Sequence, residues 1–498
     1  MKPLLILLLL GPLATTPVLA NNDLPDIGLS ASARISSSQE YQIGRAIVRN
    51  LHQQGAIVTD PEITAYIQSI GSRIAVHAHD GNQRFTFFVV DDPQINAFAL
   101  PGGFIGVHTG LINATSNENE LAGVLAHEIA HVSQKHIARM IESSGQTSIL
   151  TTAAIVAAVL IGGLTGAGGD AMGAAVSVAQ GAAMQQQINF TRENEYEADR
   201  IGITYLADAG FDPQGMPTFF KTLARKTGTS GIQIPEFFRT HPMTSNRIAE
   251  TSDRANQLAQ LDVPSSTSYK LAKARLSVLA HDNPTTALQN IEDRIEGHPT
   301  EERDELQYAY ALALIRSGRA GQAVELLEPL LQRNQGIIAF HTIYAEALHA
   351  SGDVEDALKS YDKSQQLFPR NVPITMSHSA ALIENDRPEK ARKLMLDLVN
   401  NVNYTTEQLR LLAMAASSAG YSGDAHYYMS EFHVLNGELI LAADQLEMAL
   451  KAPDIRDYQY ARIESRLQQI QEVIRNSRKQ QRKPRREPGP RELAIAVN

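Results

Sequence analysis

Apolar residues recur every three or four positions through much of the chain, the pattern of helices that bury one face. One stripe follows Asp60 and Pro61, an N-cap residue and a proline at the first helical position. A second follows Asn117, whose pairing with Glu120 is typical of a capping box. A further helical pattern runs from Ser37 to about Gln54. The two stripes consist of Ile63, Ile67, Ile70 and Ile74, and of Leu121, Val124, Leu125, Ile129 and Val132.

Short runs rich in aromatic and β-branched residues interrupt these helices and predict strands at residues 85–90, 97–100 and 104–108. Pro101-Gly102-Gly103 separates the last two and predicts a tight connection between them. Two interpretations of this pair stay open. It is either a hairpin that only supports the helices, or a strand edge with which an extended substrate pairs.

A different pattern occupies residues 145–189, where residues 149–164 are almost wholly apolar and Gly and Ala dominate from there to residue 183. The apolar run is shorter than the ~20 residues that a transmembrane helix usually needs. We weigh three structures for this insertion: a hydrophobic hairpin packed beside the second stripe, a mobile lid, and a segment that enters or crosses a membrane.

The second half of the chain repeats with a period of 34 residues. Small or turn-forming residues mark the period, an alanine lies five positions after each, and a large residue lies four positions further on. This spacing is the tetratricopeptide signature, and it predicts an α-solenoid over residues 269–474 whose concave surface binds peptides or partner proteins. The three series are Gly318, Gly352, Asp386 and Gly420; Ala323, Ala357, Ala391 and Ala425; and Leu327, Tyr361, Met395 and Met429.

Both ends of the chain differ from the rest. Met1, Lys2 and the apolar residues 4–10 predict a secretory signal peptide over residues 1–20, with cleavage after Ala20 and an unstructured leader at 21–36. Arginine, lysine, proline and glutamine crowd residues 475–498, which we expect to form a disordered basic tail. Peripheral contact of this tail with an anionic membrane surface is the alternative.

Composition narrows the classes of function. With 498 residues, of which 43% are hydrophobic, the chain is long enough for two or three domains with ordinary cores. A net charge of −10 argues against a general nucleic-acid-binding protein. The chain has no cysteine, which excludes disulfides, thiolate metal sites and cysteine nucleophiles.

The helix predicted from the second apolar stripe contains candidate metal-binding and catalytic residues. His127 and His131 are four residues apart, so both imidazoles lie on one face of the predicted helix, and Glu128 follows the first. This is the HExxH pattern of zinc hydrolases, in which the glutamate activates a metal-bound water. The other interpretation is an ordinary amphipathic helix with two solvent-facing histidines.

A second cluster strengthens the metal interpretation. Glu195 and Asp199 are again four residues apart, and a catalytic zinc usually takes three protein ligands. Glu195 would complete the set begun by His127 and His131, and Asp199 would accept the spare N–H of a ligand histidine and fix its tautomer. A solvated acidic helix face is the alternative for this cluster.

Four stretches in this order resemble the CAAX prenyl protease and HtpX type of zinc metallopeptidase: residues 96–112, the HExxH motif, the segment around Glu195 and Asp199, and His241-Pro242 with Arg247. The resemblance covers about residues 35–260. It implies an α+β, mostly α fold with a zincin-like metallopeptidase domain at 37–261, followed after a linker at 262–268 by the solenoid. It also implies one Zn²⁺ per chain.

His241 has two candidate roles near that zinc. It would either stabilise the oxyanion of the tetrahedral intermediate or occupy the fourth zinc position and hold the site in a self-inhibited state. A turn histidine without such a role is the third interpretation. His108 and His136 bear no spacing relation to the motif, so we place neither in the metal set and interpret His136 as a surface or packing residue.

The order of signal peptide, metallopeptidase and repeat array resembles exported bacterial quality-control proteases of this type. The resemblance implies a periplasmic endopeptidase that cleaves unfolded or misfolded envelope proteins, with Glu128 as the base. It also implies chaperone-like work on outer-membrane β-barrel proteins and contact with their assembly machinery. Two alternatives remain: a non-proteolytic adaptor with a structural zinc site, and an integral membrane protease whose residues 149–164 span a bilayer.

Overall fold

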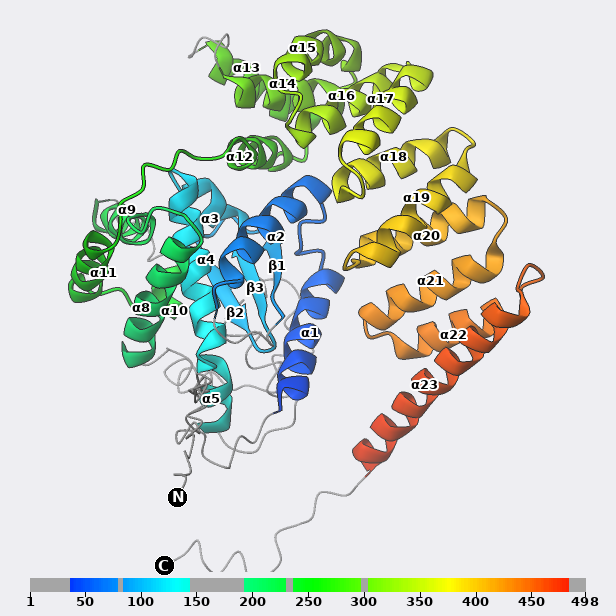
Figure 1. The fold of residues 1–498 in the computed structure, drawn as a ribbon, viewed down its shortest axis with the longest axis horizontal. Helices are drawn as coiled ribbons and strands as arrows, with labels where there is room; N and C mark the ends of the chain where they lie inside the picture. The colour runs from blue at the N-terminus through cyan, green and yellow to red at the C-terminus, as the bar shows by residue number, and fades with distance from the viewer. Residues whose placement is uncertain (1–35, 79–83, 144–191, 230–235, 297–302, 483–498) are drawn as a thin grey trace, which may run out of the picture.

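The computed structural model describes residues 36–78, 84–143, 192–229, 236–296 and 303–482, and it consists of a mixed α and β half and a helical array (Figure 1). The predicted signal peptide, the leader up to residue 35 and the insertion 145–189 lie outside the described residues. The first half contains α1 (Ser37–Gln53), α2 (Pro61–Ala75), β1 (Thr86–Val90), β2 (Ala97–Leu100), β3 (Phe104–His108), α3 (Thr109–Ala114), α4 (Glu118–Ser133), α5 (His136–Ser143), α8 (Arg192–Asp208), α9 (Gly215–Thr229), α10 (Glu236–Thr240) and α11 (Ser245–Gln257).

The three predicted strands form one sheet in the order β1-β3-β2. β1 and β3 are parallel, whereas β2 and β3 are antiparallel, with Ala97 opposite Val107. Gly102 and Gly103 make the connection between β2 and β3, with φ angles of 78° and 86° that favour glycine. α2 packs on β1, α4 on β2 and α1 on β3, so the sheet is buried and β2 lies at its edge beside α4.

The start of α4 is capped as its sequence predicts, with one difference. The Asn117 side chain accepts a hydrogen bond from the Glu120 N–H at 3.0 Å. The Glu120 carboxylate accepts from the Ser116 N–H at 2.6 Å, one residue before the position of a standard capping box. Because this cap fixes the start of α4, it also fixes the direction of the two histidines, which lie about three and four turns further along the helix.

Close packing of α4 against α9 depends on one glycine. A Cβ atom on Gly123 would lie 2.8 Å from both the Cα and the backbone nitrogen of Met216, which cannot move as a side chain does. We expect Gly123→Ala to lower the free energy of unfolding by about 1–3 kcal/mol. Gly321→Ala is the matched control, because nothing lies within 4 Å of its Cβ position in α15. Thermal unfolding of both variants checks this, and equal shifts in the two midpoints would contradict the packing argument.

The second half is the predicted array of antiparallel helix pairs. Gly318, Gly352, Asp386 and Gly420 all have positive φ angles, so each marks the turn between the two helices of a pair. The alanines of the repeat are buried where those helices cross. Its helices are α12 (Thr267–Leu279), α13 (Pro284–Glu296), α14 (Asp304–Arg316), α15 (Ala320–Arg333), α16 (Ile338–Ser351), α17 (Val354–Leu367), α18 (Val372–Glu384), α19 (Pro388–Asn401), α20 (Thr406–Ser418), α21 (Ser422–Leu435), α22 (Leu439–Leu450) and α23 (Asp457–Arg482).

The array packs against the first half and is not connected to it by a flexible linker alone. The predicted linker is non-helical up to Ser266, but Glu118 of α4 accepts hydrogen bonds from the Ser266 N–H and hydroxyl, both at 2.8 Å. Tyr269 and Leu276 of α12 belong to the core of the first half. Further along, α18 contacts α2, and Glu407 of α20 lies 3.2 Å from His52 of α1. The array therefore curves around the sheet side of the first half (Figure 1).

The prediction of a disordered tail from residue 475 is wrong for residues 475–482, which continue α23. Ile463, Leu467 and Ile470 of α23 are buried against α22, so tertiary packing forms the helix. Arginine, lysine and glutamine are good helix formers and extend a helix once it exists. Residues 483–498 lie outside the described part of the chain.

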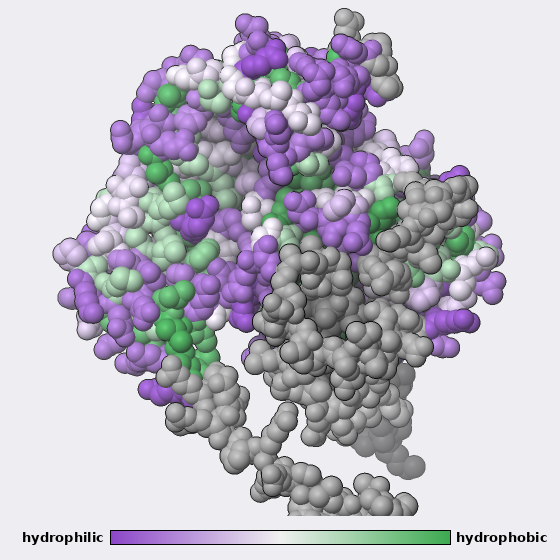
Figure 2. Space-filling model, turned by 180° about the vertical axis from the view of Figure 1, so that it is seen from behind, coloured by the Kyte–Doolittle hydropathy of each residue, from purple (hydrophilic) through white to green (hydrophobic). Residues whose placement is uncertain are grey.

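Figure 2 shows a mostly hydrophilic face with a hydrophobic patch close to where the described part of α23 ends. α22 and α23 together expose Ile440, Leu441, Met448 and Val473. Among the described residues, no helix combines the length and the apolar character that crossing a bilayer requires. The apolar run 149–164 is not among those residues, so its predicted alternatives stay predictions.

Candidate metal centre

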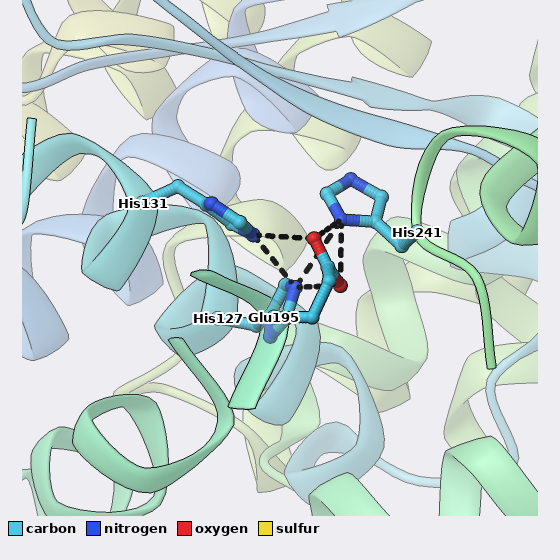
Figure 3. A group of neighbouring side chains, drawn as sticks. All are labelled: His127, His131, Glu195 and His241. Atoms are coloured by element: carbon cyan, nitrogen blue, oxygen red, sulfur yellow. Dashed lines mark hydrogen bonds and ion pairs between the residues drawn. The ribbon is translucent and has the colours of Figure 1, made fainter. Parts of the chain in front are cut away.

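α4, α8 and the residue after α10 bring four candidate ligands together (Figure 3). His127 and His131 project from one face of α4, Glu195 comes from the first turn of α8, and His241 follows α10. One ligand atom from each lies within 4.8 Å of the others, and all four side chains are at most 1% exposed. The three residues predicted as ligands and the predicted His241 thus form one buried cluster.

The distances within this cluster suit tetrahedral coordination of one metal ion. The Nε2 atoms of His127 and His131 are 3.0 Å apart, and His127 Nε2 lies 3.3 Å from His241 Nδ1. His241 Nδ1 lies 3.1 Å from Glu195 Oε1, and His131 Nε2 lies 3.3 Å from the same oxygen. Ligands at the ~2.0–2.1 Å of a Zn–N bond are roughly 3.3 Å from one another in a tetrahedron.

The charge of the cluster also suits a cation. Burial alone would lower the pKa of His127, but Asp199 and Glu195 outweigh burial and raise it to about 9. The buried carboxylates therefore stabilise positive charge at His127. Burial lowers the pKa of His131 well below its usual range, which keeps that imidazole neutral and available as a ligand. The four residues thus fit a divalent metal in both geometry and electrostatics.

Asp199 lies where the sequence predicts. Its Oδ1 is 3.0 Å from His127 Nδ1, the ring nitrogen that points away from the cluster. A carboxylate at this nitrogen fixes the tautomer that presents Nε2 to a metal. Glu195 and Asp199 are one turn apart on α8, so one helix supplies both a ligand and the group that orients another ligand.

His131 has an equivalent partner in His136, for which the sequence left open a surface or a packing position. His136 is fully buried, and its Nδ1 lies 2.8 Å from His131 Nδ1. Its Nε2 lies 3.0 Å from Glu197 Oε2, nearer the surface. Lys135, with a φ angle of 56°, turns the chain back after α4 and brings His136 beside His131. Helical periodicity cannot predict this contact, because the helix ends between the two residues.

Arg247 of α11 is a further residue whose role in the site the sequence does not predict. It is 1% exposed, and its Nε and Nη2 donate to the two oxygens of Asp199 at 2.7 and 2.8 Å. Its Nη1 lies 2.7 Å from Glu195 Oε2. One guanidinium thus holds both carboxylates of α8 in place. In the sequence, Arg247 stands out only as part of the His241-Pro242 element, which gives no sign that its guanidinium reaches Glu195 and Asp199.

Glu128 lies beside the cluster without joining it. It is fully buried, and neither of its carboxylate oxygens has a hydrogen-bond partner among the described residues. Burial raises its pKa, which makes it a stronger base than an exposed glutamate. Glu128 Oε1 lies 3.5 Å from His241 Nε2. His108, by contrast, lies 3.9 Å from Asp92 at the end of β3 and is not part of the cluster.

Comparisons with known proteins agree with this geometry. Residues 61–255 match the model of peptidase family M48. The "Beta-barrel assembly-enhancing protease" of Escherichia coli strain K12 is 31% identical over 451 residues, which cover 90% of this chain and 91% of that protein. The protein of the same name from Yersinia pestis is 31% identical over 96% of this chain and 98% of its own length.

A more distant relative matches only part of the chain. The human "Metalloendopeptidase OMA1, mitochondrial" is 31% identical over 163 residues, which are 32% of this chain and 30% of that protein. The bacterial relatives, in contrast, extend through the array. The chain belongs to peptidase family M48 and is a metalloendopeptidase.

Proposed function

We propose that the chain is an exported zinc endopeptidase that cleaves misfolded or stalled envelope proteins in the periplasm. The convergence of His127, His131, Glu195 and His241 in one buried cluster beside Glu128 carries the proposal. The N-terminal apolar residues 4–10 after Lys2 support export. The relatives named β-barrel assembly-enhancing protease support action during outer-membrane β-barrel assembly.

Within this site each side chain has one task. His127, His131 and Glu195 would hold the zinc, Asp199 and His136 would orient the two imidazoles, and Arg247 would fix Glu195. Zinc, when bound, would lower the pKa of a water molecule toward ~7 and polarise the scissile carbonyl. Glu128 takes the proton of the attacking water and hands it to the leaving amine. The site's burial excludes other water from this transfer.

In this proposal the array recruits substrates and partner proteins to the peptidase half. Tetratricopeptide-like arrays bind extended peptides and partner proteins on their concave face. The array here is held against the peptidase half at α2 and α1, which fixes the position of a bound partner relative to that half. In this proposal the array recruits misfolded chains to the peptidase half and acts on them as a chaperone. The array would also contact the β-barrel assembly machinery.

Removal and return of the metal tests this function. We expect one zinc per chain by elemental analysis, and cleavage of unfolded casein that a chelator abolishes and Zn²⁺ restores. A denatured outer-membrane barrel should be cleaved and its folded form spared. Chelator-resistant cleavage, or full cleavage without bound zinc, would contradict the zinc mechanism.

His241 lies where a fourth ligand would lie, which supports its role in a self-inhibited resting state. Its Nδ1 is 3.1 Å from Glu195 and 3.3 Å from His127. We therefore expect His241→Ala to keep zinc and to cleave casein severalfold faster, because the fourth position becomes open to water. His349→Ala, in the array, is the control. A loss of activity in the first variant would instead assign His241 to oxyanion stabilisation.

A further inference from the structure

The two candidate ligand histidines of α4 are oriented by different kinds of group. The outer ring nitrogen of His127, Nδ1, lies 3.0 Å from the carboxylate of Asp199. The same nitrogen of His131 lies 2.8 Å from another imidazole, at the Nδ1 of His136. An ionised carboxylate can only accept a hydrogen bond, whereas an imidazole can donate or accept one. The positions of the protons therefore decide what His136 does for His131.

The ligand role of His131 fixes the direction of that hydrogen bond. Its Nε2 faces the cluster, 3.0 Å from His127 Nε2 and 3.3 Å from Glu195 Oε1. A metal at Nε2 takes the lone pair of that nitrogen, so the single proton of the neutral ring is on Nδ1. His131 therefore donates and His136 Nδ1 accepts. The proton of His136 is then on its Nε2, which faces Glu197 Oε2 at 3.0 Å.

This series of hydrogen bonds ends on a carboxylate near the surface. Arg139 of α5 lies 3.5 Å from the same oxygen of Glu197 that His136 contacts. Glu195 and Glu197 are two positions apart on α8, about 200° around the helix, so the first faces the cluster and the second faces α5. The side chain of Glu197 is 35% exposed, whereas that of Asp199 is 4% exposed. One ligand histidine is thus oriented from the interior and the other from the surface.

We propose that Glu197 is a positioning residue of the metal centre and acts on His131 through His136. The negative charge of Glu197 stabilises the proton on His136 Nε2, which keeps His136 Nδ1 as the acceptor for His131. A ligand imidazole that donates its outer N–H is more basic at the other nitrogen and binds a metal more tightly. The inference rests on the proposed zinc centre and adds a residue that reaches it through an intermediate ring.

Loss of the Glu197 charge should weaken zinc binding without removing a ligand. A group that contacts a ligand histidine directly typically contributes roughly 10–100-fold to metal affinity. Glu197 acts through one more ring, so we expect an effect near the lower end of that range. Because Glu197 is partly exposed, its replacement by glutamine leaves no buried charge without a partner.

A comparison of Glu197→Gln with Glu193→Gln in the full-length protein tests the proposal. Glu193 is exposed and lies one turn before Glu197 on α8, so both substitutions remove one negative charge from the same part of the helix. In a zinc competition titration, we expect the dissociation constant to rise about tenfold in Glu197→Gln and to stay unchanged in Glu193→Gln. Equal dissociation constants in the two variants, or an unchanged one in Glu197→Gln, would overturn the proposal.

Nuclear magnetic resonance of the histidine rings tests the route through His136. In the zinc-loaded protein with isotope-labelled histidine nitrogens, we expect protons on His131 Nδ1 and His136 Nε2. Glu197→Gln should shift both signals and leave that of His127 Nδ1 in place, because Asp199 still holds it. A general loss of packing would move all three. A proton on His136 Nδ1, or a shift at His127 as large as that at His131, would overturn the proposal.

Neither measurement depends on turnover. A protein that binds zinc but leaves casein intact would contradict the proposed protease and could still show both effects. A zinc-dependent protease with the same zinc affinity in both variants would keep the proposed function and contradict only the role of Glu197.

Discussion

Glu128→Gln is expected to reduce peptide hydrolysis by at least about a hundredfold, because positioned general bases contribute roughly 10²–10⁴-fold. The carboxylate lies beside the four candidate ligands, and no other described acid is buried there without a hydrogen-bond partner. Glutamine has the same shape but cannot accept the proton. Initial rates of casein cleavage, measured together with zinc content and circular dichroism, check this expectation.

The fold and metal of this variant should be preserved. Burial raises the pKa of Glu128, which means that the folded state disfavours its charged form. Replacing it with a neutral isostere therefore removes an unfavourable charge instead of breaking a contact. Glu193→Gln is the control, since Glu193 is an exposed acid in the same first turn of α8 as Glu195. Cleavage that persists in Glu128→Gln, or a loss of zinc from it, would refute the assignment of the base.

Arg247→Met is expected to lower the free energy of unfolding by about 3–5 kcal/mol and to weaken zinc binding, because it breaks a buried charge network on one side. The guanidinium bonds both oxygens of Asp199 and contacts Glu195, and all three side chains are buried. Methionine fills the volume of the stem but leaves two carboxylates without a cation. Thermal unfolding of the metal-free protein and a zinc competition titration measure the two effects.

Arg254→Met on the same helix provides the matched control. Among the described residues, Arg254 pairs with Glu250 alone, one turn earlier, at 3.2 Å, and both side chains are about two-fifths exposed. An exposed pair of this kind contributes roughly 0.3–0.5 kcal/mol. Equal destabilisation by the two substitutions would show that the position of Arg247 in the network does not matter. Added zinc should restore part of the loss in Arg247→Met, because the ion offsets the same negative charge.

Periodicity predicted the elements that carry the site because these elements bury apolar stripes. The stripes of α2 and α4, the three strands and the 34-residue repeat all depend on local spacing, which a sequence displays directly. The prediction that the disordered tail begins at residue 475 was wrong for a related reason. Residues 475–482 have a polar composition typical of disorder, but the buried stripe that precedes them on α23 extends the helix.

The sequence by itself determined two residue pairs of the candidate site. His127 with His131 and Glu195 with Asp199 are each one helical turn apart, so any helix brings the members of a pair onto one face. Together with the 34-residue repeat, these pairs identified a metallopeptidase joined to a helical repeat array.

Only the tertiary structure decided which residues support those ligands. His136 reaches His131 through a left-handed turn, and Arg247 reaches α8 from α11. The physical reason is the same in each case. These contacts join segments whose separation along the chain bears no relation to helical or strand geometry, so only the packing of the elements in three dimensions brings them together.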